Sequence, residues 1–433
     1  MTKLILLELN ELNFDLVSAY IDWGLSLPAF EKLIKYCTKR TTTSEAQYDH
    51  LEPWVQWVSV HTGKSFKEHE VFRLGDIVNF EHEQFYESIE RRGYKVGAVS
   101  PMNAKNMLAD PAFFIPDPWT MTDPDGSWQS RFLHQALVQA VNDNSSQKIT
   151  LNSAAKLAAA IVSLLPFSRL LNLTAKLKWA TGRKWRKAIY LDMILSGAFE
   201  GLLKRYNPDF AVLFLNAGAH IQHHYMMSSS VVSPNSNFKN PDWYVEGSAD
   251  PMAEVLRKYD QLLDRLFNLK DYEFIVATAL SQTPCARPHF YYRLSDHEQF
   301  LKHLKIKFKI VEPRMTRDFL IKFEDDEQRD LAYDIMSKLS VNGEKIFGVL
   351  EMRSSEIFAT LTYDREITIN CHVDVPSGEA IRLKEYVVFV AIKNGVHDGK
   401  GYVFKSPKLP GHLFLENRDH VKNLRQYIES IFP

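Results

Sequence analysis

Short apolar runs alternate with amphipathic segments along most of this chain, and the alternation limits the folds open to it. The segments between the runs, such as residues 14–24 and 81–93, have the spacing of helices with one apolar face. The runs themselves are apolar throughout, as are strands buried on both faces of a parallel sheet. We therefore predict an α/β fold with a doubly wound, mostly parallel sheet. The candidate strands are residues 3–9, 95–100, 210–215, 273–280 and 385–392.

Two regions interrupt the alternation. Residues 146–205 have helical character with little sign of strands, and residues 301–375 follow a strand–helix–strand–strand pattern. We interpret the first region as a helical insertion or cap and the second as a small α+β insertion. The α/β core would then consist of three parts, residues 1–145, 206–300 and 376–433.

Composition narrows the class of protein. The 433 residues contain 52 Lys and Arg against 53 Asp and Glu, so net charge gives no sign of a nucleic-acid partner. The three cysteines are far apart, which argues against a disulfide framework and for a reducing compartment. The apolar run before Glu8 is too short for a secretion signal, and no run reaches the roughly 18 residues of a membrane span. We expect a cytoplasmic protein.

Residues 167–191 mix Leu, Trp and Ile with Lys and Arg. One interpretation is a pair of helices that lies on a membrane surface or on an acidic partner. The alternative is a helical cap that packs on the core and has a solvated basic face. A peripheral membrane contact through this segment therefore stays open at this point.

Three histidines follow the candidate strand at 210–215. His220 and His223 or His224 would share one face of a helix, where imidazole nitrogens can bind a zinc-like metal ion. Two histidines rarely suffice, so further ligands must come from elsewhere. His397, in a glycine-rich turn after another apolar run, is a candidate. The alternative is a set of histidines that only stack, bond to neighbours or face solvent.

Polar residues also follow the other candidate strands, where ligands bind in open α/β sheets. Asn10, Glu11 and Asn13 follow the first run, although Asn10 or Asn13 could equally cap a helix. His50 and Glu52 precede Pro53, at a predicted helix N-terminus that favours anions. Together these residues could line one crevice. The candidates for binding substrate there are Asn13, Ser100, Asn103, Ser281 and Gln282.

The order of these stretches resembles the alkaline phosphatase-like superfamily, in particular its type I phosphodiesterase/nucleotide pyrophosphatase branch. The residues that carry the resemblance are "WVSVHTGKSFKEHEVF" (57–72), "AHIQH" (219–223), "LSQ" (280–282) and "NGVHDGKG" (394–401). The resemblance implies metal-dependent hydrolysis of a phosphoester. It carries over His223 and His397 as metal ligands, with His220 as an adjacent histidine.

The sequence departs from the superfamily pattern at several positions. Asn10 and Ala219 stand where the pattern has aspartate ligands, and its Asp-His pair is missing at Leu280–Ser281. The nucleophile position falls near Glu52–Pro53, which offers no hydroxyl. Two close dications would be poorly neutralised there unless glutamates take the place of the lost aspartates. The candidates for that role are Glu8, Glu11 and Glu52.

These observations favour a phosphoester hydrolase with a remodelled site that binds one divalent metal ion, zinc or manganese. Its substrate would be a small-molecule phosphoester or a sugar or lipid phosphate. The alternatives are a catalytically inactive ligand-binding or regulatory protein on the same scaffold, and a membrane-associated enzyme acting on lipid-linked saccharides. The candidate catalytic residues are Glu52, Glu11 and His50. The candidate metal ligands are His223, His397, His220 and Asn10.

Overall fold

The computed structural model describes residues 2–142, 151–314, 317–375 and 381–433. Two compact units make up the chain. The first contains residues 1–236, 241–284 and 395–433, and the second contains residues 237–240 and 285–394. The predicted insertion at 146–205 and the predicted third core part at 376–433 each begin outside the described residues.

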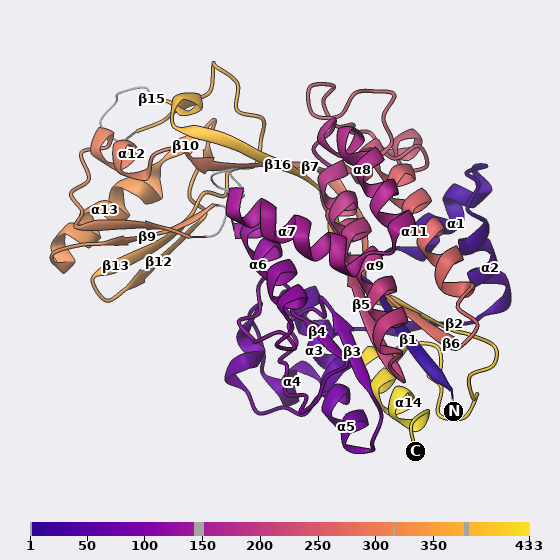
Figure 1. Cartoon of the computed structure of the whole chain (residues 1–433). Coiled ribbons are helices and arrows are strands. Elements are labelled where there is room, and N and C mark those ends of the chain that lie inside the picture. Colours follow the sequence, from indigo (N-terminus) through magenta and orange to yellow (C-terminus); the bar gives the residue numbers. More distant parts are fainter. Residues whose placement is uncertain (1, 143–150, 315–316, 376–380) are drawn as a thin grey trace. The chain divides into compact units, whose positions relative to one another are not determined.

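Strand β1 (Lys3–Leu9) lies inside an eight-stranded sheet in the first unit (Figure 1). The strand order of this sheet is β18-β2-β17-β6-β1-β5-β3-β4. β1 pairs in parallel with β5 and β6, and β3 pairs in parallel with β4 and β5. β17 is antiparallel to both of its neighbours, β6 and β2. The predicted mostly parallel sheet is confirmed. The other strands are β2 (Thr38–Thr43), β3 (Val96–Val99), β4 (Phe113–Ile115), β5 (Phe210–Leu215), β6 (Tyr272–Ala277), β17 (Lys400–Lys405) and β18 (Asp419–His420).

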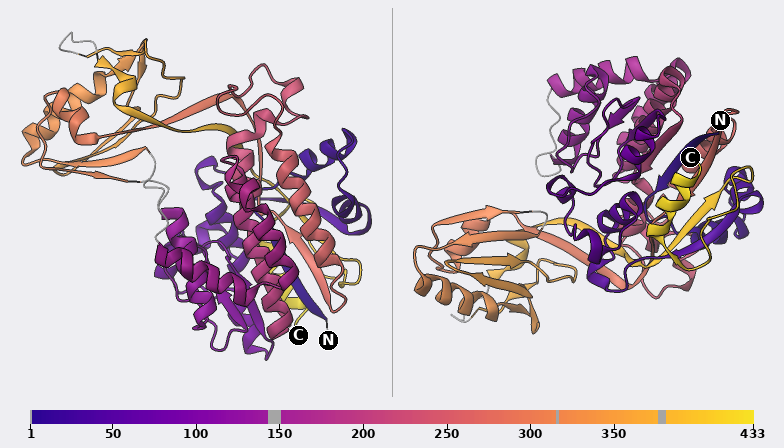
Figure 2. Two further views of the ribbon diagram at one scale, coloured as in Figure 1. Left: turned by 45° about the horizontal axis from the view of Figure 1, so that its top comes forward. Right: turned by 90° about the horizontal axis from the view of Figure 1, so that it is seen from below.

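Helices cover both faces of this sheet (Figure 2). Ile5 and Leu7 of β1 face one buried apolar cluster, and Leu4 and Leu6 face the other, because successive side chains of a strand point to opposite faces. The doubly wound arrangement is therefore confirmed. The first face is covered by α1 (Phe14–Asp22), α2 (Pro28–Tyr36), α9 (Arg186–Tyr206) and α11 (Pro251–Phe267). The second is covered by α3 (Pro53–Thr62), α5 (Phe85–Arg91) and α14 (Leu424–Ser430).

The predicted helical insertion is part of the first unit. Ala160, Leu164, Leu173 and Trp185 are buried in the same apolar cluster as β1, so these helices pack on the core. None of the described helices is long and apolar enough to cross a bilayer. Besides α9, the described helices of this region are α7 (Leu151–Leu164) and α8 (Phe167–Thr181), and α6 (Trp128–Asn142) precedes them in the sequence.

The second unit is a small α+β structure. Its main sheet is antiparallel, with the order β12-β13-β9-β8. The unit spans 285–394, more than the predicted 301–375. Its larger elements are α12 (His297–His303), β8 (Ile310–Pro313), β9 (Asp318–Lys322), α13 (Asp326–Lys338), β12 (Val349–Arg353) and β13 (Glu356–Thr360). Short strand pairs are β10 (Ser340–Val341) with β11 (Glu344–Lys345), and β14 (His372–Val373) with β15 (Ile381–Arg382).

The prediction that residues 385–392 form a strand of the main sheet is wrong. These residues contribute to β16 (Val387–Asp398), which pairs with β7 (Ser281–Leu294) instead. Val388 and Val390 are exposed, so this apolar run is not the mark of a strand buried on both faces. The main-sheet strand of this region is β17, whose residues from Gly401 to Lys405 are buried.

The strand directions bring four distant segments to one edge of the main sheet. Leu9 of β1 lies opposite Leu215 of β5, and Glu8 lies opposite Ala277 of β6, so these parallel strands end side by side. β17 runs the other way, so it starts where β6 ends. The residues that follow β1, β5 and β6 therefore meet those that precede β17.

Gly201 on α9 offers a test of how tightly the helices pack on one another. A Cβ added there would lie 1.6 Å from the backbone oxygen of Leu164. Gly→Ala in an open helical position stabilises a protein by about 0.5–1 kcal/mol, whereas overpacking costs about 1–3 kcal/mol. We expect Gly201→Ala to lower the free energy of unfolding by about 2 kcal/mol in urea titrations. Gly182→Ala, where the nearest atom lies 3.4 Å away, should change it little. Equal stability of the two variants would contradict this packing.

Candidate metal site

Three side chains converge at the edge where β1, β5 and β6 end. The Oε2 atom of Glu11 lies 3.1 Å from Nε2 of His223 and 3.1 Å from Nε2 of His397. The two Nε2 atoms lie 3.3 Å from each other. Within the described ranges, this is the one group of three or more His, Cys, Asp or Glu side chains close enough to share a metal ion. We call it the Glu11–His223–His397 cluster.

Glu11 has a left-handed backbone with φ of 55°, which is uncommon for a residue other than glycine. Its backbone N–H donates to Thr278 O at 3.2 Å, and its backbone oxygen accepts from Nε2 of Gln222 at 2.8 Å. The Gln222 Oε1 atom accepts from the backbone N–H of Asn13 at 3.0 Å. Gln222 on helix α10 (Ala217–Tyr225) therefore holds the loop after β1 in the conformation that directs the Glu11 side chain.

Both carboxylate oxygens of Glu11 are held by amide donors. Asn10 Nδ2 donates to Oε1 at 3.0 Å, and Gln282 Nε2 donates to Oε2 at 2.6 Å. Burial alone would raise the pKa of Glu11, but the charges and hydrogen bonds of His223 and His397 hold that pKa well below its usual range. Glu11 is therefore an ionised, fully buried carboxylate.

Asn10, a predicted metal ligand, supports the cluster but does not belong to it. Its Oδ1 accepts from Trp57 Nε1 at 2.8 Å, and its Nδ2 also donates to Asn216 Oδ1 at 2.8 Å. The amide is thus already bonded at both ends and fixes the Glu11 carboxylate, as residues behind a metal ligand commonly do.

Helix α10 carries the histidines, and a buried carboxylate holds its N-terminus. Asp192 accepts from the backbone N–H of Ala217 at 2.8 Å and from the hydroxyl of Tyr259 at 2.6 Å. Burial raises the pKa of Asp192 to about 6, although these hydrogen bonds act in the opposite direction. This arrangement fixes the position of the helix, and so of His223, relative to the sheet.

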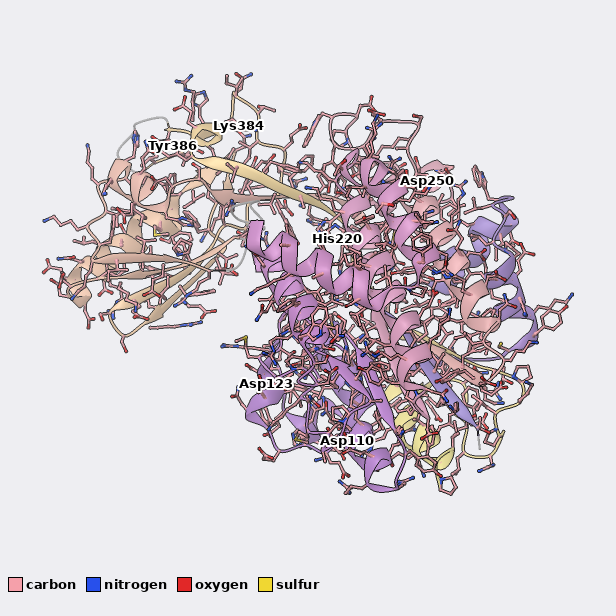
Figure 3. The ribbon with its side chains drawn as sticks, viewed as in Figure 1. Asp110, Asp123, His220, Asp250, Lys384 and Tyr386 are labelled. Carbon is pink, nitrogen blue, oxygen red and sulfur yellow. The ribbon has the colours of Figure 1, made fainter. Side chains whose placement is uncertain are left out.

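His220, labelled in Figure 3, lies one turn before His223 on α10 and is not part of the cluster. Its ring centroid lies 4.9 Å from that of His224 and 6.2 Å from that of Tyr225. Burial lowers the pKa of His220 to about 4. The predicted pairing of His220 with His223 on one metal is therefore not the arrangement seen in this structure.

His397 reaches the cluster from the end of β16, and a glycine makes this approach feasible. A Cβ on Gly395 would lie 2.4 Å from Gln282 Oε1 and 2.8 Å from Gln222 O, so only glycine fits there. The other ring nitrogen of His397, Nδ1, lies 3.7 Å from Oε2 of Glu52. Glu52 precedes α3 as its N-cap residue and is partly exposed, so it borders the cluster on the solvent side.

Four other predicted site residues, His50, Asn13, Asn103 and Ser100, are not part of the cluster. The His50 ring packs on Phe66, with 4.0 Å between ring centroids. The Asn13 Oδ1 atom caps α1 by accepting from two backbone N–H groups. Asn103 donates to Trp54 O at 3.0 Å and accepts from the Gly75 N–H at 2.9 Å, which ties loops together. Ser100 is buried directly after β3.

The two predicted residues after β6 differ from each other. Gln282 contacts Glu11 itself, as described above. The Ser281 hydroxyl is buried and has no hydrogen-bond partner among the described residues. Sequence reasoning missed Gln222 and Asp192. Gln222 was visible beside His223 in "HIQHH", but nothing near Asp192 in the sequence points to α10.

Comparisons with known proteins give structural similarities at low sequence identity. A phosphonoacetate hydrolase from Sinorhizobium meliloti 1021 in complex with phosphonoformate has 11% identity and a TM-score of 0.44, covering 99% of this chain and 96% of that one. Murine ectonucleotide pyrophosphatase/phosphodiesterase 5 has 11% identity and a TM-score of 0.41, covering 100% and 95%. Alkaline phosphatase from the Antarctic bacterium TAB5 has 10% identity and a TM-score of 0.40, covering 99% and 97%. The sequence matches no protein-family profile and no curated protein.

Asp192 gives a pH-dependent test of how α10 is held. Its pKa of about 6 in the folded state lies above the usual 3.8, so the folded state keeps a proton that the unfolded state loses. Stability is therefore lost as pH rises from about 4 to about 6. We compare the free energy of unfolding of the wild type with that of Asp192→Asn at each pH. This difference should fall by about 2 kcal/mol, to the disadvantage of the wild type, between pH 4.5 and pH 7.5. Parallel urea titrations of the two proteins at both pH values measure this difference, and a constant difference would disprove it.

Proposed function

We propose that Glu11, His223 and His397 bind one divalent metal ion. With metal–ligand bonds of about 2.0–2.2 Å, ligand atoms lie about 3.3 Å apart at tetrahedral angles and about 3.0 Å apart at octahedral angles. The separations of 3.1, 3.1 and 3.3 Å in the cluster fall in this range. A carboxylate oxygen and two imidazole nitrogens are also a donor set that zinc-like ions accept.

The surroundings of the cluster support this proposal. A metal-binding imidazole usually donates its second N–H to a carboxylate, carbonyl or water, which turns its other nitrogen toward the metal. Glu52 is placed to approach this role, since its Oε2 lies 3.7 Å from Nδ1 of His397, which is ion-pair range and longer than a hydrogen bond. Asn10 and Gln282 fix the carboxylate of Glu11 from behind. Zinc or manganese is the metal that we propose, since imidazole suits the first and carboxylate the second.

We further propose that the protein hydrolyses a small-molecule phosphoester. A bound divalent ion would supply Lewis acidity and lower the pKa of water at the site. Glu11 is engaged by two amides and two imidazoles, so it serves as a ligand and not as the general base. Glu52 borders the cluster and is partly exposed, so we assign it to accept the proton of the attacking water. The order of motifs along the sequence supports the phosphoester as the substrate class.

A second candidate function is ligand binding without catalysis. The first residues of α3 are Pro53 and Trp54, preceded by Glu52, and none of them has a hydroxyl group that could attack phosphorus. Hydrolysis must then use water directly. If water is not activated at this site, the same cluster would hold a phosphorylated ligand through the metal and release it unchanged.

Elemental analysis of protein purified without chelator or histidine tag tests the metal site. We expect about one zinc or manganese per chain in the wild type and in His220→Ala, because His220 lies outside the cluster. We expect the metal to be lost in His223→Ala. Hydrolysis of bis(p-nitrophenyl) phosphate and p-nitrophenyl phosphate by the same three proteins should follow the metal content.

The outcomes separate the two functions. Metal in the wild type without turnover of either phosphoester would favour the ligand-binding protein. Absence of metal from the wild type after incubation with zinc and manganese would reject the proposed site. Metal lost equally from His220→Ala and His223→Ala would reject the assignment of ligands, provided that melting curves show both variants to be folded.

Glu52→Gln tests the proposed general base. We expect kcat to fall at least about 100-fold while metal content stays unchanged, because general bases contribute about 10²–10⁴ to the rate. The acidic limb of the pH–rate profile should disappear with the carboxylate. Asp49→Asn, an exposed carboxylate three residues earlier, is the matched control and should keep full activity. Loss of metal from Glu52→Gln would instead show that Glu52 only orients His397.

A further inference from the structure

Charge is distributed unevenly along the sequence. The chain as a whole has nearly equal numbers of basic and acidic residues, but residues 144–191 contain no Asp or Glu. Nine basic residues lie in that stretch, one of them outside the described residues. A stretch of this length with only one sign of charge points to an anionic partner. The nine are Lys148, Lys156, Arg169, Lys176, Lys178, Arg183, Lys184, Arg186 and Lys187.

The arginines and the lysines of this stretch have different environments. Arg169, Arg183 and Arg186 form ion pairs with Glu200, Glu246 and Glu254, respectively, so they serve the internal structure of the first unit. The lysines at 178, 184 and 187 are exposed. Lys178 is on α8, Lys184 lies between α8 and α9, and Lys187 is at the start of α9, so these three can meet an external anion.

Helix α8 has apolar side chains on two opposite faces. Leu173 and Ala180 are buried and pack on the core. Phe167 and Leu171, one turn apart on the other face, are 73% and 53% exposed. Lys178 lies on that same outer face, two turns after Leu171. The core therefore leaves the outer apolar residues of α8 without a packing role.

Two further large apolar side chains close by in the sequence are also exposed. Leu177 on α8 is 54% exposed, and Val162 near the end of α7 is 61% exposed. Single exposed apolar residues are ordinary, but here four large ones fall within sixteen residues of sequence. We call Val162, Phe167, Leu171 and Leu177, together with the exposed lysines 178, 184 and 187, the α8 surface.

We propose that the α8 surface docks on a membrane surface that contains anionic lipids. A helix that lies in the interface buries its apolar side chains at the boundary of headgroups and acyl chains, while its lysines meet lipid phosphates. A nucleic acid would satisfy the lysines but give Phe167 and Leu171 no apolar environment. The combination of both kinds of side chain therefore favours a bilayer. The inference is independent of the proposed metal site.

Co-sedimentation of the full chain with vesicles tests the proposal. We expect binding to phosphatidylcholine vesicles that contain phosphatidylserine, weaker binding at high salt, and little binding to pure phosphatidylcholine. Phe167→Ser/Leu171→Ser should weaken binding at least about tenfold, because both side chains are removed from the apolar layer. Trp23→Ser/Met121→Ser removes two exposed apolar side chains elsewhere in the unit and should bind as the wild type does.

A charge variant completes the test. Lys178→Glu/Lys184→Glu/Lys187→Glu should abolish binding to the anionic vesicles at low salt. No binding of the wild type to these vesicles at low salt would overturn the proposal. It would also be overturned if the charge variant lost binding while Phe167→Ser/Leu171→Ser bound normally, since that pattern describes a soluble polyanion. Melting curves of each variant show that any loss reflects the surface and not unfolding.

Discussion

The buried, ionised carboxylate of Glu11 is the interaction on which the rest of the candidate site depends. A carboxylate without water is strongly disfavoured unless opposite charge and hydrogen bonds compensate for its lost hydration. Here two amides, Asn10 and Gln282, bind its oxygens, and two imidazoles face it. Each of these groups comes from a different segment of the chain. The negative charge of Glu11 is therefore stable only where the segments that carry these four groups come together.

The direction of β17 allows the four segments around Glu11 to come together. Parallel strands place their carboxyl ends at one edge of the sheet. The segments that follow β1, β5 and β6 therefore bring Glu11, His223 and Gln282, respectively, to that edge. His397 precedes a strand instead of following one. Because β17 is antiparallel to β6, the residues before it reach the same edge. If β17 ran parallel to β6, the residues before it, including His397, would lie at the opposite end of the strands.

Features set by local sequence patterns, such as strand bounds, could be predicted from the sequence. Features set by contacts between distant residues, such as strand pairing, could not. The bounds of β1 and β5 agree with their apolar runs, because both strands are buried on both faces. Residues 385–392 show the same apolarity, but residues 387–392 belong to β16, since an apolar run does not specify its pairing partner. The convergence of His223, His397 and Glu11 depends on that pairing as well. Spacing along α10 alone favoured His220 equally.

Charge balance connects the proposed metal ligands to the proposed chemistry. One carboxylate, Glu11, against a divalent ion leaves one positive charge, and the neutral side chains of Asn10 and Ala219 add none to offset it. A second dication nearby would raise that excess to three, and the partly exposed Glu52 could offset one of these charges. A single ion held by Glu11, His223 and His397 would instead keep one positive charge, which would suit a phosphoester with anionic oxygens. The single carboxylate of the cluster is therefore in keeping with the proposed one-metal chemistry, in which the substrate would supply the remaining negative charge.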